Sequence, residues 1–168
     1  CLVALQRVGE AAAAAGRALA LEPADALTLD TIGVVFSHAN DHARAAQAFA
    51  GAVRLAPRHP GYQFNLGAAL RFTGDVTAAG QAFDAAIALS PRFWKAYPAR
   101  SELRRQTAGQ NHIAQLESLL ANAGPDTDGE LHLRHALAKE YEDLGDAASA
   151  FAHLAAGKAR KRRELPYD

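Results

Sequence analysis

The chain has a single cysteine, no methionine, and equal numbers of acidic and basic residues in 168 positions. One cysteine excludes an internal disulfide. Zero net charge excludes the broad positive field that draws a protein to nucleic acid or an anionic membrane. No apolar run approaches the ~20 residues of a membrane span, and no charged-then-apolar leader opens the chain. We therefore expect a cytoplasmic protein without membrane contact.

The missing methionine also bears on completeness. Cys1 falls inside an expected helix whose N-terminal part is absent. We expect the chain to be a fragment of a longer protein.

Motifs for chemistry are missing as well. The sequence contains no G-x-S-x-G, no G-x-x-x-x-G-K-[ST] and no G-x-G-x-x-G after a strand. His38 and His42 straddle a turn, and His132 and His135 lack both the H-E-x-x-H glutamate and a third ligand. We expect no catalytic residue, no metal site and no cofactor.

A repeat dominates what is present. Pro23, Pro57 and Pro91 stand 34 residues apart, and each follows an alanine-rich stretch of helical pattern. Proline disfavours helical geometry in the residue before it, so each proline is expected to end a helix. A 34-residue period is typical of a helix–turn–helix unit that stacks on its neighbours.

The positions inside the period repeat too. Large apolar residues occupy positions four, seven, eleven and 24 of the unit at 26–59, and small residues occupy positions eight, 20 and 27. The spacing puts the large residues on one helical face, and the small residues let paired helices approach closely. The turns Asn40-Asp41, Gly74-Asp75 and Gly145-Asp146 each combine a residue tolerant of left-handed geometry with a helix-capping carboxylate. The signature residues of the two regular units are Gly33, Ala45, Pro57, Gly67, Ala79 and Pro91.

This pattern resembles the tetratricopeptide repeat (TPR). The resemblance implies an all-α fold, a right-handed superhelical solenoid of antiparallel helix pairs, with a concave face that binds a protein or peptide. We expect one TPR domain over 1–168: a partial repeat at 1–25, with its second helix at Glu10–Leu21, regular repeats at 26–59 and 60–93, a degenerate repeat at 94–130, a capping repeat at 131–163, and a linker to a further domain at 164–168.

The last two repeats are the less regular ones. The repeat at 94–130 is 37 residues long, and Arg100 and Arg104 stand where apolar residues were due. Its helices are expected from near Trp94 to Gln106 and over Asn111–Ala123. Those of the final repeat are expected near Leu131–Leu144 and from Asp146 to about Arg163.

The concave face is the candidate site. In TPR stacks, the first helix of each pair lines this face, which makes Phe64, Asn65, Arg71, Phe72, Lys95 and Arg105 the candidate peptide-binding residues. Asn65 is able to bond both a carbonyl and an N–H of an extended ligand, and the two phenylalanines are able to act as anchors. The alternative is that the phenylalanines pack internally and the charges are solvated. A clamp for a terminal carboxylate is disfavoured because Asp30 reverses the required charge.

Residues 94–168 carry a narrower resemblance. This part of the chain resembles the segment that precedes the catalytic domain in bacterial TPR–sulfotransferase fusion proteins. The resemblance lies in the stretches Gln110–Ala121, Leu131–Asp146, Ala150–Leu154 and Gly157-Lys158, which are followed by Tyr167-Asp168. The resemblance implies an accessory role beside an in-cis C-terminal catalytic domain. That domain would act from outside this chain.

A basic run gives the alternative function. Lys158, Arg160, Lys161, Arg162 and Arg163 place five positive charges in six positions. Such a run at a helix C-terminus is favourable against the helix dipole, and it also resembles a nucleic-acid-binding patch. RNA binding through this helix is the alternative to protein binding, disfavoured because phosphate contacts need several such clusters.

Overall fold

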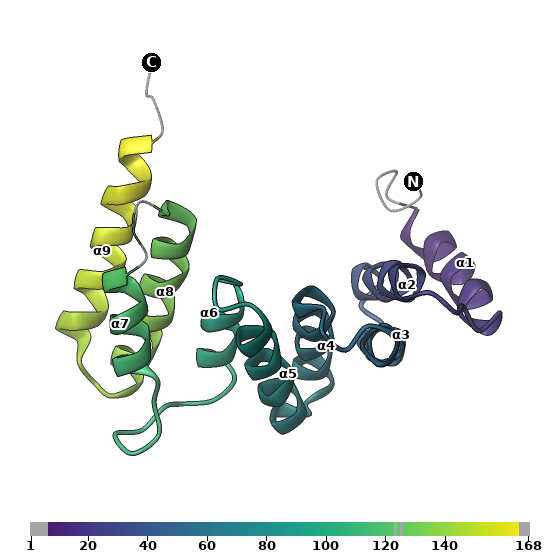
Figure 1. The fold of residues 1–168 in the computed structure, drawn as a ribbon, viewed down its shortest axis with the longest axis horizontal. Helices are drawn as coiled ribbons and strands as arrows, with labels where there is room; N and C mark the ends of the chain where they lie inside the picture. Colours follow the sequence, from purple (N-terminus) through teal and green to yellow (C-terminus); the bar gives the residue numbers. More distant parts are fainter. Residues whose placement is uncertain (1–6, 123, 125, 165–168) are drawn as a thin grey trace. The chain divides into compact units, whose positions relative to one another are not determined.

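The computed structural model describes residues 7–122, 124 and 126–164, and all their regular elements are α-helices (Figure 1). The all-α prediction is confirmed. The chain divides into two compact units, one up to Ser90 and one from Pro91. Unit 1 holds α1 (Val8–Ala20), α2 (Ala26–His38), α3 (His42–Leu55), α4 (Pro60–Thr73) and α5 (Val76–Leu89). Unit 2 holds α6 (Ala96–Ser101), α7 (Ile113–Asn122), α8 (Thr127–Asp143) and α9 (Ala147–Glu164).

The ends of the chain bear on two expectations. The expected helix before Glu10 is contradicted at Val8 and Gly9, which belong to α1 itself; the rest of it, at residues 1–6, lies outside the described residues. The linker expected at 164–168 lies outside them too, apart from Glu164 at the end of α9.

In unit 1, each helix packs on the next one along the chain through the predicted large and small residues. Phe36 and Phe83 are fully buried, and so are Ala45 and Ala79. At Gly33 the helices α2 and α3 come so close that an added Cβ would lie 2.5 Å from the Phe49 ring. Gly67 takes the same place against Phe83, at 2.8 Å. At Gly33 and Gly67 an aromatic ring of the following helix therefore packs against backbone that carries no side chain.

The helix ends also follow the sequence. Asn40 and Gly74 adopt left-handed geometry, with φ of 57° and 88°. Asp41 and Asp75 then accept hydrogen bonds of 3.0 Å from backbone N–H groups in the first turns of α3 and α5. Ser90, before Pro91, has extended geometry and ends α5.

The cap at Asp75 gives a modest, testable effect. Asp75→Ala should destabilise unit 1 by about 1 kcal/mol because the Ala78 N–H loses its acceptor. Asp75→Asn should cost much less, since an amide oxygen caps as well. Urea titrations followed by circular dichroism would measure both, and equal losses would contradict the capping role.

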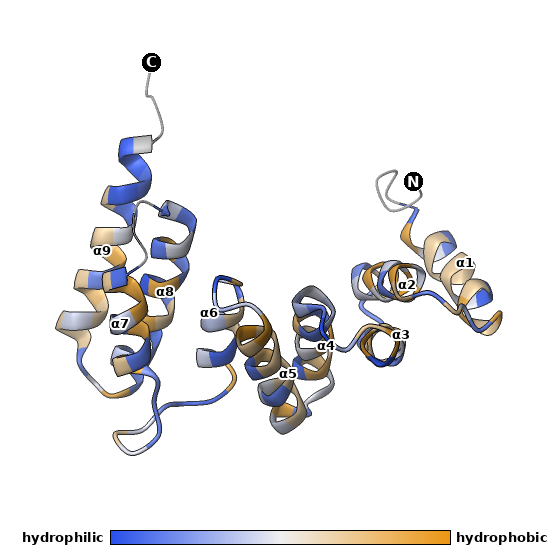
Figure 2. Ribbon diagram, in the orientation of Figure 1, coloured by the Kyte–Doolittle hydropathy of each residue, from blue (hydrophilic) through white to orange (hydrophobic). Residues whose placement is uncertain are grey.

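Unit 2 departs from the expected repeat after α6. The prediction that this helix runs to Gln106 was wrong: α6 ends at Ser101, and residues 102–112 are not helical. The buried side chain of Gln106 donates to the Ser101 carbonyl at 3.3 Å, which occupies an acceptor that a continuing helix would need. The backbone N–H of Gln106 donates to Asp143 of α8 at 2.9 Å. Figure 2 shows this segment mostly in the colours of hydrophilic residues.

A buried carboxylate holds the same segment from its other end. Glu140 of α8 is fully buried and accepts hydrogen bonds from the Ser101 hydroxyl and the His112 backbone N–H, both at 2.5 Å. Its Oε1 also lies 2.9 Å from His112 Nδ1. Burial by itself would raise the pKa of Glu140, but the hydrogen bonds from His112 and Ser101 outweigh it and leave the pKa below its usual value. The carboxylates of Glu140 and Asp143 on α8 thus hold both ends of α6's following segment, 102–112, by hydrogen bonds. In this unit α6 packs on α8.

The helix α8 begins at Thr127, four residues before the expected start at Leu131. Asp126 caps it by accepting from the Gly129 N–H at 2.9 Å, and it also accepts from Trp94 Nε1 and Arg92, each at 2.9 Å. The Gly129 bond, with those from Arg92 and Trp94, lowers the pKa of Asp126 to about 2. Helix α9 matches its predicted span, and α7 starts two residues later than predicted.

Candidate peptide-binding site

A hollow of about 390 Å³ opens in unit 1 between α2, the start of α3 and α4. Its apolar lining includes Val34, Phe49, Ala68 and Phe72, and its polar lining comes from serine, histidine and asparagine side chains. Phe72 is 62% exposed and Val34 38% exposed. Water therefore covers apolar surface here that a ligand could cover instead.

Phe72 is held in place at the mouth of this hollow. Its ring stacks on the His42 imidazole, with centroids 4.2 Å apart and planes inclined by 11°. The Arg71 guanidinium lies 5.3 Å from the centre of the Phe72 ring. An exposed ring fixed by its neighbours loses little side-chain freedom when a ligand covers it.

Asn65 is already partly engaged. Its Nδ2 donates to Asp30 of α2 at 2.8 Å, which ties α4 to α2 on the face where the hollow lies. An amide has two N–H donors and an acceptor oxygen, so this bond uses one donor only. The predicted bonding of Asn65 to a carbonyl and an N–H of a ligand stays a prediction, with Asp30 already holding one of its donors.

The remaining predicted residues lie elsewhere. Phe64 is half-buried, and its ring packs on Phe83 with centroids 5.6 Å apart, as the internal-packing alternative foresaw. Lys95 and Arg105 belong to unit 2, where Lys95 Nζ lies 5.8 Å from the centre of the Phe93 ring and Arg105 donates to the Asp143 carbonyl at 3.4 Å. Of the six candidates, the hollow brings together Asn65 and Phe72, with Arg71 over the phenyl ring.

The sequence did not single out His42 as part of this site. The sequence favours a surface or groove histidine at this position over a metal ligand, and the structure stacks the His42 ring on Phe72. The available signal was its repeat position directly after the capping Asp41, at the start of α3.

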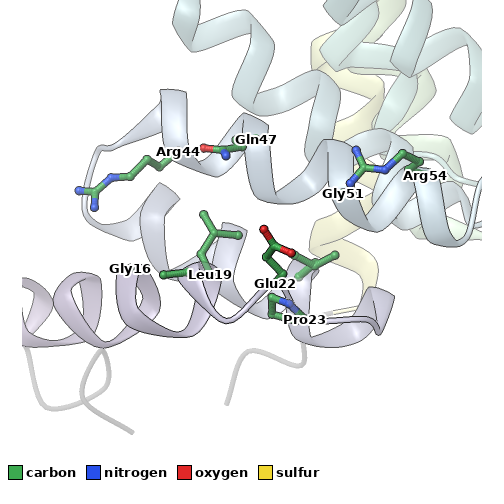
Figure 3. Close-up of a pocket in the computed structure, with 10 residues that line it drawn as sticks. Gly16, Leu19, Glu22, Pro23, Arg44, Gln47, Gly51 and Arg54 are labelled. Carbon is green, nitrogen blue, oxygen red and sulfur yellow. The ribbon is translucent and has the colours of Figure 1, made fainter.

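A second, wider cleft of about 780 Å³ lies between α1, α2 and α3 (Figure 3). Two arginines line it, but Figure 3 shows the Arg44 and Arg54 guanidinium groups at opposite ends. Arg44 pairs with Asp41 at 2.6 Å and lies over the Phe36 ring. The two cations therefore do not converge on one anion, and the hollow beside Phe72 is the better candidate.

Within the described residues, no group of three histidine, cysteine, aspartate or glutamate side chains is arranged to hold a metal ion. None of the described helices is long and apolar enough to cross a membrane.

Comparison with known proteins bears on the fold. Residues 60–93, which form α4 and α5 with their connections, match a family model described as a tetratricopeptide repeat. The chain has a tetratricopeptide repeat fold. A crystal structure of MamA superposes with a TM-score of 0.71 at 16% identity, over 99% of this chain and 95% of that one. A second MamA crystal structure gives a TM-score of 0.70 at 17% identity, over 99% and 92%. No curated protein sequence matches the chain.

The TPR fold is one of protein–protein interaction scaffolds and is generally non-enzymatic. At these identities the structural likeness extends to the fold alone. The resemblance of residues 94–168 to sulfotransferase fusions, the repeat boundaries and the binding roles of individual residues stay predictions.

Proposed function

We propose that unit 1 binds an extended peptide or partner segment on the face formed by α2 and α4. The observation that carries this proposal is the exposed Phe72 ring, stacked on His42 at the mouth of an apolar hollow. Exposed aromatic side chains in preformed hollows are the usual anchors of protein recognition.

The chemistry of the hollow limits what fits. Val34, Ala68 and Phe49 offer an apolar floor, and the polar groups around it, such as Ser37 and Asn65, are uncharged. A ligand with one large apolar side chain would insert it here and lay its backbone across the Asn65–Asp30 pair. The remaining amide hydrogen and the oxygen of Asn65 suit backbone groups of any sequence. Selectivity then rests on the inserted side chain.

Phe72→Ala tests the proposal. Peptides selected from a displayed random library on the wild-type chain should bind this variant at least about tenfold more weakly, because truncating an aromatic anchor typically costs more than 1 kcal/mol. Titration calorimetry measures the affinity. Leu55→Ala, at an exposed apolar residue on the far end of α3, is the matched control and should leave binding unchanged.

The result that counts against the proposal is equally clear. If the selected peptides bind Phe72→Ala and wild type with equal affinity, the hollow is not the site. Asn65→Ala combined with Arg71→Glu gives a second check, expected to weaken the same peptides by about 1–2 kcal/mol through lost polar contacts.

We infer an accessory role in a larger enzyme only from the resemblance to sulfotransferase fusions. Reading the coding sequence on both sides of the chain tests it, and an unrelated neighbouring domain would end the idea. The RNA-binding alternative rests on the exposed Lys158, Lys161, Arg162 and Arg163. A salt-insensitive or absent gel shift with mixed RNA would remove it.

A further inference from the structure

Unit 2 carries an exposed apolar face on its last helix. Phe151 is 72% exposed and Leu154 is 47% exposed, and both line a hollow of about 320 Å³ between α8 and α9. Ala138, Ala147 and Ala150 also line this hollow. Side chains this large and this exposed on adjoining turns of a helix mark an interaction surface.

The repeat shows what this face is built to contact. Counted from the turn aspartates Asp41, Asp75 and Asp146, Leu154 stands at the position of Phe49 and Phe83, which are 2% and 0% exposed. In unit 1 this side of α3 is covered by α4, whose Ala69 joins Phe49 in one core cluster. Ala147 stands at the position of His42, on which Phe72 of α4 stacks. The face of α8 and α9 is therefore a helix-packing surface.

Charge is arranged on this face in a particular order. Ala147, Phe151, Leu154, Lys158 and Arg162 recur at three- and four-residue spacings, so they form one stripe along α9. The stripe is apolar at Phe151 and Leu154 and basic at Lys158 and Arg162. Figure 2 shows the C-terminal end of α9 in the colour of hydrophilic residues. At its other end, Ala147 and the exposed Glu142 of α8 line the hollow, and Lys139, which also lines it, is neutralised by an ion pair with Asp143 at 2.6 Å.

We propose that a second copy of this chain covers the face, with the two α9 helices packed antiparallel about a two-fold axis between Phe151 and Leu154. A two-fold interface must be self-complementary, because the same patch meets itself in reverse. Here Lys158 lies four residues beyond Leu154, and Ala147 lies four residues before Phe151. Reversing the stripe therefore sets Lys158 of one copy beside Ala147 and Glu142 of the other, and Phe151 beside Leu154.

The alternative occupant, a helix of another protein or of a segment beyond residue 168, would not need this order. It would need apolar side chains in the middle of the stripe, but nothing would require basic and acidic groups at matching distances on either side. The observed order favours the second copy. The dimer surface lies in unit 2, whereas the proposed peptide site lies in unit 1, so the two proposals succeed or fail separately.

Sedimentation equilibrium of the chain tests the dimer. We expect the mass to rise from 17.8 kDa to twice that value between about 1 and 300 μM, because an interface with few apolar side chains is at the weak end of specific association. Leu154→Asp should keep the chain monomeric over this range. Leu55→Asp is the matched control, since Leu55 is 48% exposed but lies in unit 1, and it should dimerise like wild type.

Exchanging the charges at the two ends of the stripe tests whether the partner is a second copy and whether the two α9 helices run antiparallel. Glu142→Lys alone, and Lys158→Glu with Arg162→Glu, should each weaken the dimer at least about fivefold by setting like charges together. An equimolar mixture of the two variants should recover the wild-type association, because each then meets the opposite charge. All three residues are exposed, so these variants do not depend on core packing.

Three outcomes overturn the proposal. A chain that stays monomeric to 300 μM leaves the face to another protein. A dimer that survives Leu154→Asp uses another surface. A mixture that associates no better than its components excludes the antiparallel arrangement. If Leu154→Asp loses its helical circular dichroism, the charge exchange alone decides.

Discussion

Glu140→Ala should destabilise unit 2 by about 3 kcal/mol or more. The carboxylate is fully buried and accepts from the Ser101 hydroxyl and from both the backbone and the ring of His112. Removing it leaves a buried hydroxyl and a part-buried N–H without an acceptor, and it opens a cavity. Urea unfolding followed by tryptophan fluorescence would measure the loss, because Trp94 lies in the same unit.

Two further variants make this result specific. Glu142→Ala, at an exposed position on the same helix, should change stability by less than about 0.5 kcal/mol at protein concentrations below those of the dimer. Glu140→Gln keeps the volume and should lose less than the alanine variant. If Glu140→Ala unfolds at the wild-type urea concentration, the network does not hold unit 2 together.

The Glu140 effect should also depend on pH. The folded-state pKa of this carboxyl lies below its usual value of about 4.3. A carboxyl group whose pKa is lowered by folding stabilises the fold above its unfolded-state pKa, and that contribution is lost as the pH falls through the folded-state value. The stability difference between wild type and Glu140→Gln should therefore shrink as the pH falls below about 4. A difference that grows in that acidic range would contradict the hydrogen-bonding scheme.

Gly33→Val should be the most damaging single change in unit 1, at about 3 kcal/mol or more. An added Cβ at this position lies 2.5 Å from the Phe49 ring, which is 2% exposed and packed between α2 and α4. The ring has no room to move, so the helices must separate. Thermal unfolding followed by circular dichroism would show the loss as a lower midpoint.

A second glycine serves as the control. Gly16 lies in the middle of α1, and an added Cβ there would meet only Arg44 Nη1, at an ordinary contact distance of 3.5 Å. Gly16→Ala should therefore stabilise the chain by about 0.5–1 kcal/mol through the higher helix propensity of alanine. Equal stability of Gly33→Val and wild type would mean that α2 and α3 do not approach as described.

The regular half of the chain was predictable because each of its features is local. A proline ends a helix through its own geometry, and an aspartate caps the helix that follows it. A glycine makes room for the phenylalanine ring 16 residues later, on the following helix. These rules account for the capped starts of α3 and α5 and for the end of α5 before Pro91. The early end of α6 was not predictable in this way, because it depends on Asp143 and Glu140, nearly 40 residues further along the chain. The one sign of this in the sequence was Glu140, a glutamate at the repeat position that Val35 and Ala69 occupy in unit 1.

The candidate site was only partly accessible to the same reasoning. The repeat offset places Asn65 and Phe72 on one helical face, and both line the same hollow in the structure. Whether a ring on that face is exposed depends on what lies across from it. The Phe64 ring packs on Phe83 and is half-buried. The Phe72 ring stacks on the flat face of His42 and is mostly exposed. Such contacts between rings depend on three-dimensional packing, which cannot be derived from a single sequence.

The contact of α6 with α8 has a consequence for how the chain comes apart. Where every helix touches chiefly its successor, as in unit 1, a terminal hairpin can melt while the rest stays intact. Unit 2 links helices that are two steps apart through Ser101 and Glu140, so loosening α8 releases α6 and the segment after it together. Hydrogen exchange should accordingly show graded protection from α1 to α5, but a single common opening rate across α6 and α8.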